Sequence, residues 1–370
     1  ESQAVGEEEC GGPVGVPSNG LEGKAREEGS AGEGEPPEVL KEFLERLLAA
    51  TGVSGYEDEV ASIISEGFKG LVDDVRRDKL GNLILLKKGE AREAPTAGGT
   101  AGCPKVMLCA HMDEIGLMVT KIEKGGFLRF APVGGIDQRV LLAQEVIVHG
   151  KRELPGVIGA KPPHIQEPDE RRKAVKRQHM FIDVGLPQEE VETLVKVGDI
   201  ATIAREPLGL KGQFLSGKAA DDRAGVAVML ECARELSHMR HAADVYFVAS
   251  VQEEVGLRGA MVSTYGIVPD IGIAIDVCHG DMPGLPEQDT VSLEKGPAIG
   301  FGPHVHPKVY NRLVEVAGQW GIPYQVEPSP HPGGTDAWAI QITQGGIATA
   351  LISVPLRYMH TSVETFALSD

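Results

Sequence analysis

The sequence lacks several features that would at once assign it to a large class of proteins. No run approaches the ~18 consecutive apolar residues of a membrane-spanning helix, and the first residues lack the charged-then-apolar order of a secretory signal. None of the five cysteines forms the Cys-x-x-Cys pair typical of a thiolate metal site, and no internal repeat occurs at a fixed period. We therefore expect a cytoplasmic protein whose cysteines are reduced.

Basic residues are too few for a protein that binds polyanions. Lysine and arginine number 36 against 54 acidic residues, which gives a net charge of -18 at pH 7. Phosphate binding needs a basic face, so this charge argues against nucleic acid and against anionic membrane surfaces as partners. Part of the excess lies in residues 1–36, where nine glutamates stand against Lys24 and Arg26. We predict that this segment is a disordered acidic tail, because it is too polar to bury a core.

The rest of the chain has ample apolar material for a folded core, at 42% of all residues. Runs that are apolar at successive positions predict strands buried on both faces of an α/β sheet. The predicted strands, which include two further segments of β character, lie at 80–86, 106–110, 245–251, 271–275, 322–326 and 348–354. Apolar residues at helical spacing predict amphipathic helices within 40–48, 60–68, 222–236 and 309–320. Residues 87–103 and 161–178 are predicted to form surface loops.

The pattern changes between Gly126 and Leu215. Short β runs there are separated by glycine and proline, which predicts a small all-β barrel inserted into the α/β chain, with strands within 127–130, 145–149, 156–158, 181–184, 199–203 and 212–215. The predicted organisation is therefore a tail over 1–36, one α/β domain over 37–117 and 214–370, and an inserted barrel over 118–213.

Histidines and carboxylates collect where the predicted strands end. His111 and Asp113 follow the 106–110 strand, and the others follow later strands or open a helix: Glu253, Glu254, Asp276, His360 and the pair Asp221-Asp222. Parallel strands end at one edge of a sheet, so these side chains are expected to converge. Each has an ordinary alternative when taken alone: a solvated Glu-Glu pair, a helix cap, or a buried histidine with satisfied hydrogen bonds.

Their occurrence together favours a metal site. Two histidines and three carboxylates, with one glutamate left over, suit a pair of zinc, cobalt or manganese ions, and a shared carboxylate can hold two ions about 3.5–4 Å apart. The remaining glutamate is then free to act as a base.

At this point the sequence resembles a known family, the M42 dinuclear metallo-aminopeptidases, over about residues 37 to 366. The motifs that carry the resemblance occur in the family's order: His111-Met-Asp113, Gly217-Lys-Ala-Ala-Asp-Asp-Arg-Ala-Gly225, Gln252-Glu-Glu-Val-Gly256, Asp276 in Ala-Ile-Asp-Val, Gly333-Gly-Thr-Asp336 and Met359-His-Thr361. The resemblance implies removal of N-terminal amino acids from peptides. It implies two divalent ions per subunit, zinc or cobalt, held by His111, Asp221, Glu254, Asp276 and His360.

The resemblance also assigns individual roles. His111 and Asp276 would hold one ion, Glu254 and His360 the other, and Asp221 would bridge them. Glu253 would be the general base, and the Asp113 carboxylate would orient His111. A cis peptide is implied between Asp221 and Asp222.

The implied fold is a mixed, mostly parallel sheet flanked by helices, of the phosphorylase/hydrolase-like type. A PDZ-like barrel used in dimerisation would interrupt it, and dimers would assemble into a hollow twelve-subunit tetrahedron. This sequence departs from the family in two places. Residues 277–281, after Asp276, differ from the family's Ala/Thr-rich version, and the chain stops ten residues after His360, where the family's closing helix would be expected.

Three rival functions are considered beside the aminopeptidase. An N-acyl amino acid deacylase or carboxypeptidase of the same metal clan would use the same ligands, but the inserted barrel favours an aminopeptidase. A non-catalytic oligomeric scaffold predicts a lost ligand position, and every position is present. A glucanase needs two carboxylates across the sugar bond and no metal, so the glucanase function finds little support in this sequence.

Overall fold

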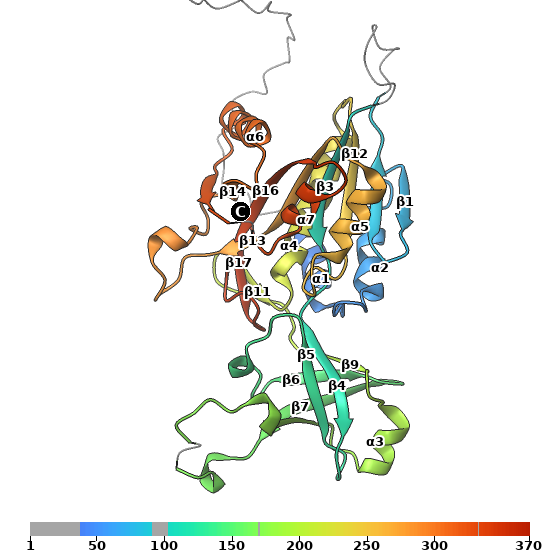
Figure 1. Cartoon of the computed structure of the whole chain (residues 1–370), viewed down its shortest axis with the longest axis vertical. Helices are drawn as coiled ribbons and strands as arrows, with labels where there is room; N and C mark the ends of the chain where they lie inside the picture. Colours follow the sequence, from blue (N-terminus) through green and yellow to red (C-terminus); the bar gives the residue numbers. More distant parts are fainter. Residues whose placement is uncertain (1–37, 91–102, 169–170, 332) are drawn as a thin grey trace, which may run out of the picture. The chain divides into compact units, whose positions relative to one another are not determined.

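The computed structural model describes residues 38–90, 103–168, 171–331 and 333–370. The predicted tail over 1–36 and most of the predicted loop over 87–103 lie outside these ranges. The described chain forms an 11-stranded sheet with helices packed on it and a closed six-stranded barrel (Figure 1). The predicted fold class, a mixed α/β sheet with an inserted barrel, is confirmed.

The large sheet has the strand order β1-β2-β12-β3-β13-β16-β17-β11-β10, with β14 pairing β16 and β15 pairing β14. Its strands are β1 (Asp74–Arg77), β2 (Leu83–Lys87), β3 (Lys105–His111), β10 (Leu208–Gly209), β11 (Phe214–Gly217), β12 (Asp244–Ser250), β13 (Ile271–His279), β14 (Ala298–Phe301), β15 (Gln325–Pro328), β16 (Ala348–Arg357) and β17 (Glu364–Ala367). The helices are α1 (Glu38–Ala49), α2 (Asp58–Gly67), α3 (Gln188–Leu194), α4 (Ala220–Ser237), α5 (Arg258–Ile267), α6 (Pro307–Trp320) and α7 (Asp336–Ile342).

Four neighbouring strands at the centre of the sheet are parallel: β12, β3, β13 and β16. They are apolar at successive positions because helices cover both of their faces. Along β3, Leu108 and Ala110 pack in the cluster formed with α1, α2 and α4, while Met107 and Cys109 pack in the cluster formed with α5 and α7. The sheet therefore has two cores, one on each face.

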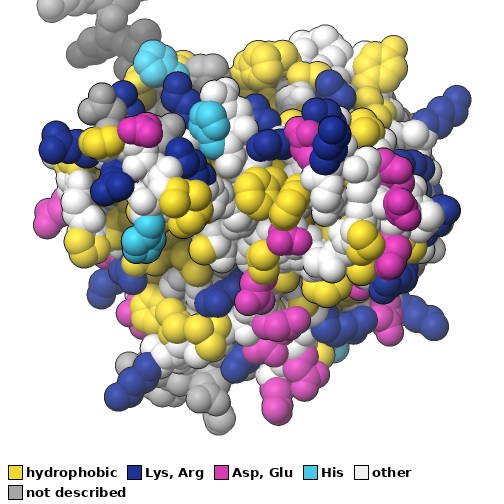
Figure 2. Space-filling model, turned by 90° about the horizontal axis from the view of Figure 1, so that it is seen from below, with side chains coloured by type: hydrophobic (Ala, Val, Ile, Leu, Met, Phe, Trp, Pro, Cys, Tyr) yellow, Lys and Arg dark blue, Asp and Glu magenta, His cyan; other side chains and the backbone are white. Residues whose placement is uncertain are grey.

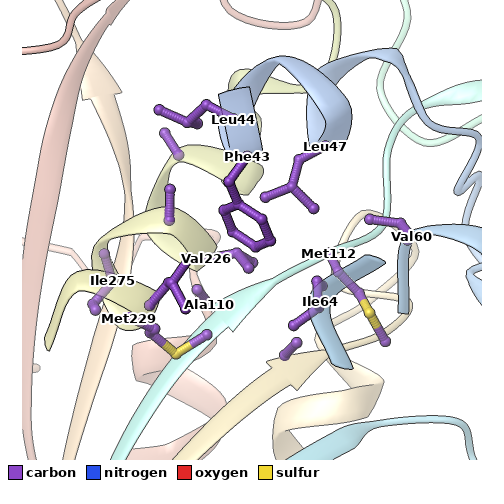
Figure 3. Close-up of a cluster of buried hydrophobic side chains, with 14 of the residues drawn as sticks. Phe43, Leu44, Leu47, Val60, Ile64, Ala110, Met112, Val226, Met229 and Ile275 are labelled. Carbon is purple, nitrogen blue, oxygen red and sulfur yellow. The ribbon is translucent and has the colours of Figure 1, made fainter. Parts of the chain in front are cut away.

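The larger of these cores joins α1, α2 and α4 to the sheet. Figure 3 shows Phe43 and Leu47 of α1 pointing toward Val226 of α4, with Met112 beyond the end of β3 beside them. Leu47 and Met112 are fully buried. The segment that follows β3 is thus fixed from the helix side, immediately next to His111.

The barrel has the strand order β4-β5-β8-β7-β6-β9 and a core of its own that includes Leu117, Leu128 and Ile182. Its strands are β4 (Gly116–Ile122), β5 (Leu128–Val133), β6 (Glu145–His149), β7 (Glu153–Ala160), β8 (Met180–Asp183) and β9 (Ile200–Ile203). Figure 2, viewed from below, shows lysines and arginines interspersed with acidic and hydrophobic side chains on that face, so the net negative charge does not make it uniformly acidic. Among the described residues, no helix has the length and apolar character needed to cross a membrane.

One local prediction was wrong. The run 212–215, expected in the barrel, instead leads into β11 of the large sheet, where Leu215 is fully buried in the sheet's core. The short stretch after His360 contains the strand β17, which pairs with both β11 and β16. Phe366 of β17 is buried in the same core as Leu215 of β11, and the two residues are register partners in the sheet.

A buried ion cluster centred on Glu114 ties α1, the end of β3 and the start of α4 together. The Glu114 carboxylate accepts hydrogen bonds from Lys218 Nζ at 2.7 and 2.8 Å, from Arg223 Nη2 at 3.3 Å and from the Gly52 amide at 3.0 Å. Arg223 is fully buried and also donates to the carbonyl oxygens of Leu47 and Ala50 at the end of α1. Desolvation opposes the charge of Glu114, but Lys218 and Arg223 hold its pKa below the usual value.

We predict that Glu114→Gln destabilises the fold strongly, because two buried cations lose their one shared anion. Breaking a buried ion pair on one side typically costs about 3–5 kcal/mol of unfolding free energy. Chemical denaturation measures the loss. The matched control is Glu45→Gln, which removes an exposed carboxylate 4.0 Å from Lys41 on α1 and is expected to change stability by less than ~1 kcal/mol. Equal effects for the two substitutions would contradict the prediction.

Candidate active site

The histidines and carboxylates predicted to converge lie together at one edge of the sheet. His111 ends β3, Glu253 and Glu254 follow β12, and His360 follows β16, all at the carboxyl ends of parallel strands. The remaining carboxylate, Asp276, lies inside β13 rather than after it, because this strand continues to His279. The edge of the sheet positions all five because each strand is held by its neighbours on both sides.

Asp221 lies at the centre of this group. One of its oxygens, Oδ1, is 3.0 Å from His111 Nε2, and the other, Oδ2, is 3.4 Å from His360 Nε2. Asp221 lies in the first turn of α4, where its φ and ψ are not helical, and the peptide bond to Asp222 is cis, as predicted. A carboxylate with each oxygen facing a different imidazole has the geometry of a bridge between two ions.

Both imidazoles are oriented by backbone carbonyl groups. His111 Nδ1 is 3.1 Å from the Asp113 carbonyl oxygen, and His360 Nδ1 is 2.8 Å from the Gly135 carbonyl oxygen. A carbonyl oxygen only accepts, so each Nδ1 carries a proton and donates it, while each Nε2 faces the site. Loss of the Nε2 proton would leave the tautomer that a metal-ligating histidine uses.

The Asp113 carboxylate contacts more than His111. Its Oδ1 is 3.6 Å from His111 Nδ1, and it accepts hydrogen bonds from the Glu253 amide at 3.0 Å and the Glu254 amide at 3.3 Å. Ser54 Oγ donates to the same carboxylate at 2.6 Å. Asp113 therefore positions the Glu-Glu segment, while its own carbonyl group orients the imidazole.

The remaining carboxylates complete two groups of donor atoms. His111, Asp221 and Glu254 offer one set of atoms within 4.8 Å of one another, and His111, Glu253 and Asp276 offer a second. His360 Nε2 is 3.4 Å from Glu254 Oε1, which adds it to the first set. Nitrogen and carboxylate oxygen donors in this number suit zinc-like divalent ions.

The carboxylates are crowded enough to keep protons at neutral pH. Burial raises the pKa of Glu253 to about 10, of Asp276 to about 8 and of Glu254 to about 7. The negative charge of these groups is therefore costly in the protein alone, and divalent cations would offset it. By this test the residues fit a metal site.

Asp221 behaves differently from its neighbours. Burial alone would raise its pKa, but the hydrogen bonds from His111 and His360 lower it, so that Asp221 stays ionised. The hydrogen bond to Asp221 in turn raises the pKa of His360 to about 9, against the effect of burial. Asp221 is thus more firmly charged than Glu253, Glu254 or Asp276.

Comparison with known proteins identifies the family. The model of a family described as M42 glutamyl aminopeptidase matches residues 94–370. The chain belongs to the M42 peptidase family. The resemblance seen in its motifs is therefore confirmed, and the protein is a hydrolase of the aminopeptidase type.

Similar proteins agree with this family over nearly the whole chain. A lysyl aminopeptidase of Pyrococcus furiosus is 40% identical over 328 residues, which cover 87% of this chain and 91% of that relative. A solved aminopeptidase structure from the archaeon Desulfurococcus kamchatkensis is 41% identical, covers 90% of this chain and 91% of its own, and has a TM-score of 0.81. The TET1 peptidase of Pyrococcus horikoshii is 34% identical, covers 90% and 95%, and has a TM-score of 0.77.

Membership of the M42 family decides between the functions considered from the sequence. An aminopeptidase is supported over a deacylase, a carboxypeptidase and a scaffold without catalysis, because the family and these relatives are aminopeptidases. The family also implies bound divalent metal, which the His and carboxylate cluster of this chain can hold.

The M42 site opens into a cavity of about 550 Å³. Its lining includes His111, Asp221, Glu253, Glu254, Asp276 and His360. Further lining residues are Val277, Cys278 and His279 at the end of β13, Glu327 of β15 and Met359. The histidines and carboxylates of the cluster therefore border one open cavity.

Two contributors to the site were missed at the level of sequence. Glu364, buried at 2% exposure, accepts hydrogen bonds from the Asp221 amide at 3.1 Å and the His360 amide at 2.8 Å. No motif in the sequence pointed to Glu364. Asp336, named in a motif but given no role, accepts from Ser250 Oγ at 2.5 Å beneath the strand ends.

Gly135, which lies between β5 and the rest of the barrel, touches the site in a way only glycine allows. A Cβ added there would lie 2.9 Å from His360 Nδ1, and one added at the preceding Gly134 would lie 3.2 Å from Glu254 Oε2. The barrel segment thus packs directly against two of the predicted metal ligands.

We predict that Gly135→Ala weakens metal binding. The added methyl group must displace the His360 ring or lengthen its bond to the Gly135 carbonyl, and loss of such a supporting contact typically costs ~10–100-fold in metal affinity. Calorimetric titration with zinc measures the affinity. Gly209→Ala is the matched control, because a Cβ there meets no atom within 4 Å. Equal zinc affinity in both variants would contradict the role of Gly135.

Proposed function

We propose that this protein is a co-catalytic, dinuclear aminopeptidase that removes N-terminal amino acids from peptides. His111 and Asp276 hold one divalent ion, Glu254 and His360 hold the other, and Asp221 bridges them. The observation that carries this proposal is the position of Asp221, whose two oxygens lie 3.0 and 3.4 Å from two different histidines. The donor set supports zinc or cobalt as the metal.

Glu253 is the proposed general base. It lines the cavity, and its Oε2 lies 3.9 Å from His111 Nε2, next to the ligand cluster but not among the closest contacts of Asp221. When bound, a pair of divalent ions would supply Lewis acidity and make water easier to deprotonate. Glu253 takes the proton of the attacking water and returns it to the departing amine. The Asp113 carboxylate keeps Glu253 in place by accepting a hydrogen bond from the Glu253 backbone amide.

The barrel is proposed to serve in self-association, and its boundaries at residues 118 and 213 stay part of this proposal. The TET1 peptidase of P. horikoshii can assemble into a tetrahedron or a large octahedral shell. The barrel of this chain exposes apolar side chains that an interface could cover, with Val157 51%, Ile165 65% and Val197 62% exposed. We propose dimers that assemble further into a tetrahedral dodecamer.

The expected location is the cytoplasm. Cys103, Cys109, Cys232 and Cys278 are free thiols, which fits a reducing compartment. The proposed substrates are peptides with a free N-terminus. Family membership does not decide which N-terminal residue is preferred, because the family is described by glutamyl and one close relative by lysyl aminopeptidase activity.

We predict that Glu253→Gln abolishes turnover but keeps the metal. The amide is isosteric but cannot take up a proton, and removing a positioned base typically costs ~10²–10⁴ in kcat. Elemental analysis of the purified variant should match the wild type, while hydrolysis of a free-amine aminoacyl substrate falls by that factor. Normal turnover would overturn the assignment of the base.

We predict the opposite division for the adjacent residue. Glu254→Gln replaces an anionic ligand 3.4 Å from His360 Nε2 by a neutral amide, so one of the two ions should be lost. Elemental analysis should give about half the wild-type metal content. Full metal content in this variant, or metal loss in Glu253→Gln instead, would show that the two roles are exchanged.

A further inference from the structure

One carboxylate in the active-site cavity takes no part in the proposed chemistry. Glu327 of β15 lines the cavity, but it belongs to neither group of metal-donor atoms. It is half-buried, and the hydrogen bond that holds it is donated by Ser353 Oγ at 3.1 Å. Ser353 pairs with Asp276 in the parallel register of β16 and β13. Glu327 therefore flanks the proposed metal ligand on the same side of the sheet.

The charge of Glu327 has no strong partner in the protein. Among the cavity-lining residues that the structure describes there is no lysine and no arginine. The basic group whose charge acts on Glu327 is His279, an exposed side chain of the same wall. Burial raises the pKa of Glu327, with the Ser353 hydrogen bond opposing, so its negative charge is unfavourable until a cation approaches.

Glu327 is not needed to neutralise the charge of two divalent ions in the cavity. Asp221, Glu253, Glu254 and Asp276 supply the negative charge that two divalent ions would neutralise. Glu327 is a further acidic side chain of the lining, and it lies apart from both donor groups. A ligand that enters a loaded site therefore meets one uncompensated negative charge on the β15 side.

The wall beside Glu327 is apolar. Cys278, on the same face of β13 as Asp276, is buried with Val291 and Ala298, and Met359 lines the same cavity. An apolar wall that ends in a carboxylate matches a long aliphatic side chain with a cation at its tip, which is the form of lysine and, with a planar head, of arginine. A glutamyl side chain would instead place a second anion against Glu327.

We propose that Glu327 selects peptides whose N-terminal residue is lysine or arginine, by pairing with the cationic end of that side chain. This inference rests on the proposed aminopeptidase function. It also gives a role to Cys278, in the segment after Asp276 that departs from the family pattern, as part of the wall along which the aliphatic stem lies.

The test compares wild type, Glu327→Gln and Glu315→Gln with lysyl-, arginyl-, leucyl- and glutamyl-aminomethylcoumarin, at one fixed zinc or cobalt concentration. All assays run at pH 8. Glu315 is the matched control, because its carboxylate is exposed on α6 and lies outside the cavity lining. Denaturation midpoints for all three proteins confirm that each is folded.

Wild type and the control should favour lysyl and arginyl over leucyl substrates. In Glu327→Gln, kcat/KM for the two basic substrates should fall roughly 10- to 100-fold, the usual worth of a charge-assisted pair, with the leucyl value unchanged within about twofold. If Glu327→Gln does not fold, Glu327→Asp, which keeps the charge, should retain the preference in weakened form.

Other outcomes overturn the inference in different ways. An equal loss for every substrate would show that Glu327 binds the peptide's α-amino group rather than the side chain. Hydrolysis of all four substrates without a basic preference in wild type would reject the specificity and leave the aminopeptidase function standing. If wild type with added metal cleaves none of the four, the proposed function itself fails, and the inference with it.

Discussion

The active site depends on a single buried carboxylate that is not part of it. Glu114 binds Lys218 and Arg223, and through them the last turn of α1, at a place where none of the three charges reaches water. Glu114 lies three residues after His111, and the two cations lie on either side of Asp221 in the sequence. The two halves of the proposed metal site are thus held in register by one ion cluster, whose parts are each costly to bury alone.

This frame makes it possible to concentrate negative charge at the edge of the sheet. Glu253, Glu254 and Asp276 lie close enough that burial raises the pKa of each, which is an unfavourable arrangement for a protein without cations. Fully paired groups beneath them, such as Asp113 with Ser54 and the amides of the Glu-Glu segment, keep the backbone from relaxing away. The stability that the Glu114 cluster contributes therefore offsets the repulsion between the carboxylates in the absence of bound metal.

The sequence predicted the parts of this architecture that depend on local pattern. The apolar runs around 106–110 and 245–251 became parallel strands, and the polar residues that follow them converge because such strands end at one edge. Contacts between segments distant in sequence were not predictable in the same way. β11 looked like a barrel strand because nothing local reveals that its partner is β17, and neither Gly135 nor Glu364 carries a pattern that signals its contact with His360.

The cavity wall around Glu327 is separate from the proposed metal site, which explains how one fold can serve different substrates. The groups that cleave the peptide bond are fixed by the central strands and by the start of α4, where a small shift would break Asp221 from one of its histidines. The wall formed by Glu327 and the end of β13 lies outside this arrangement, next to an edge strand that pairs only with β14. A change there alters what the cavity accepts without moving a ligand, so specificity can vary while the catalytic frame is kept. The preferred N-terminal residue is therefore a property of this wall and not of the fold.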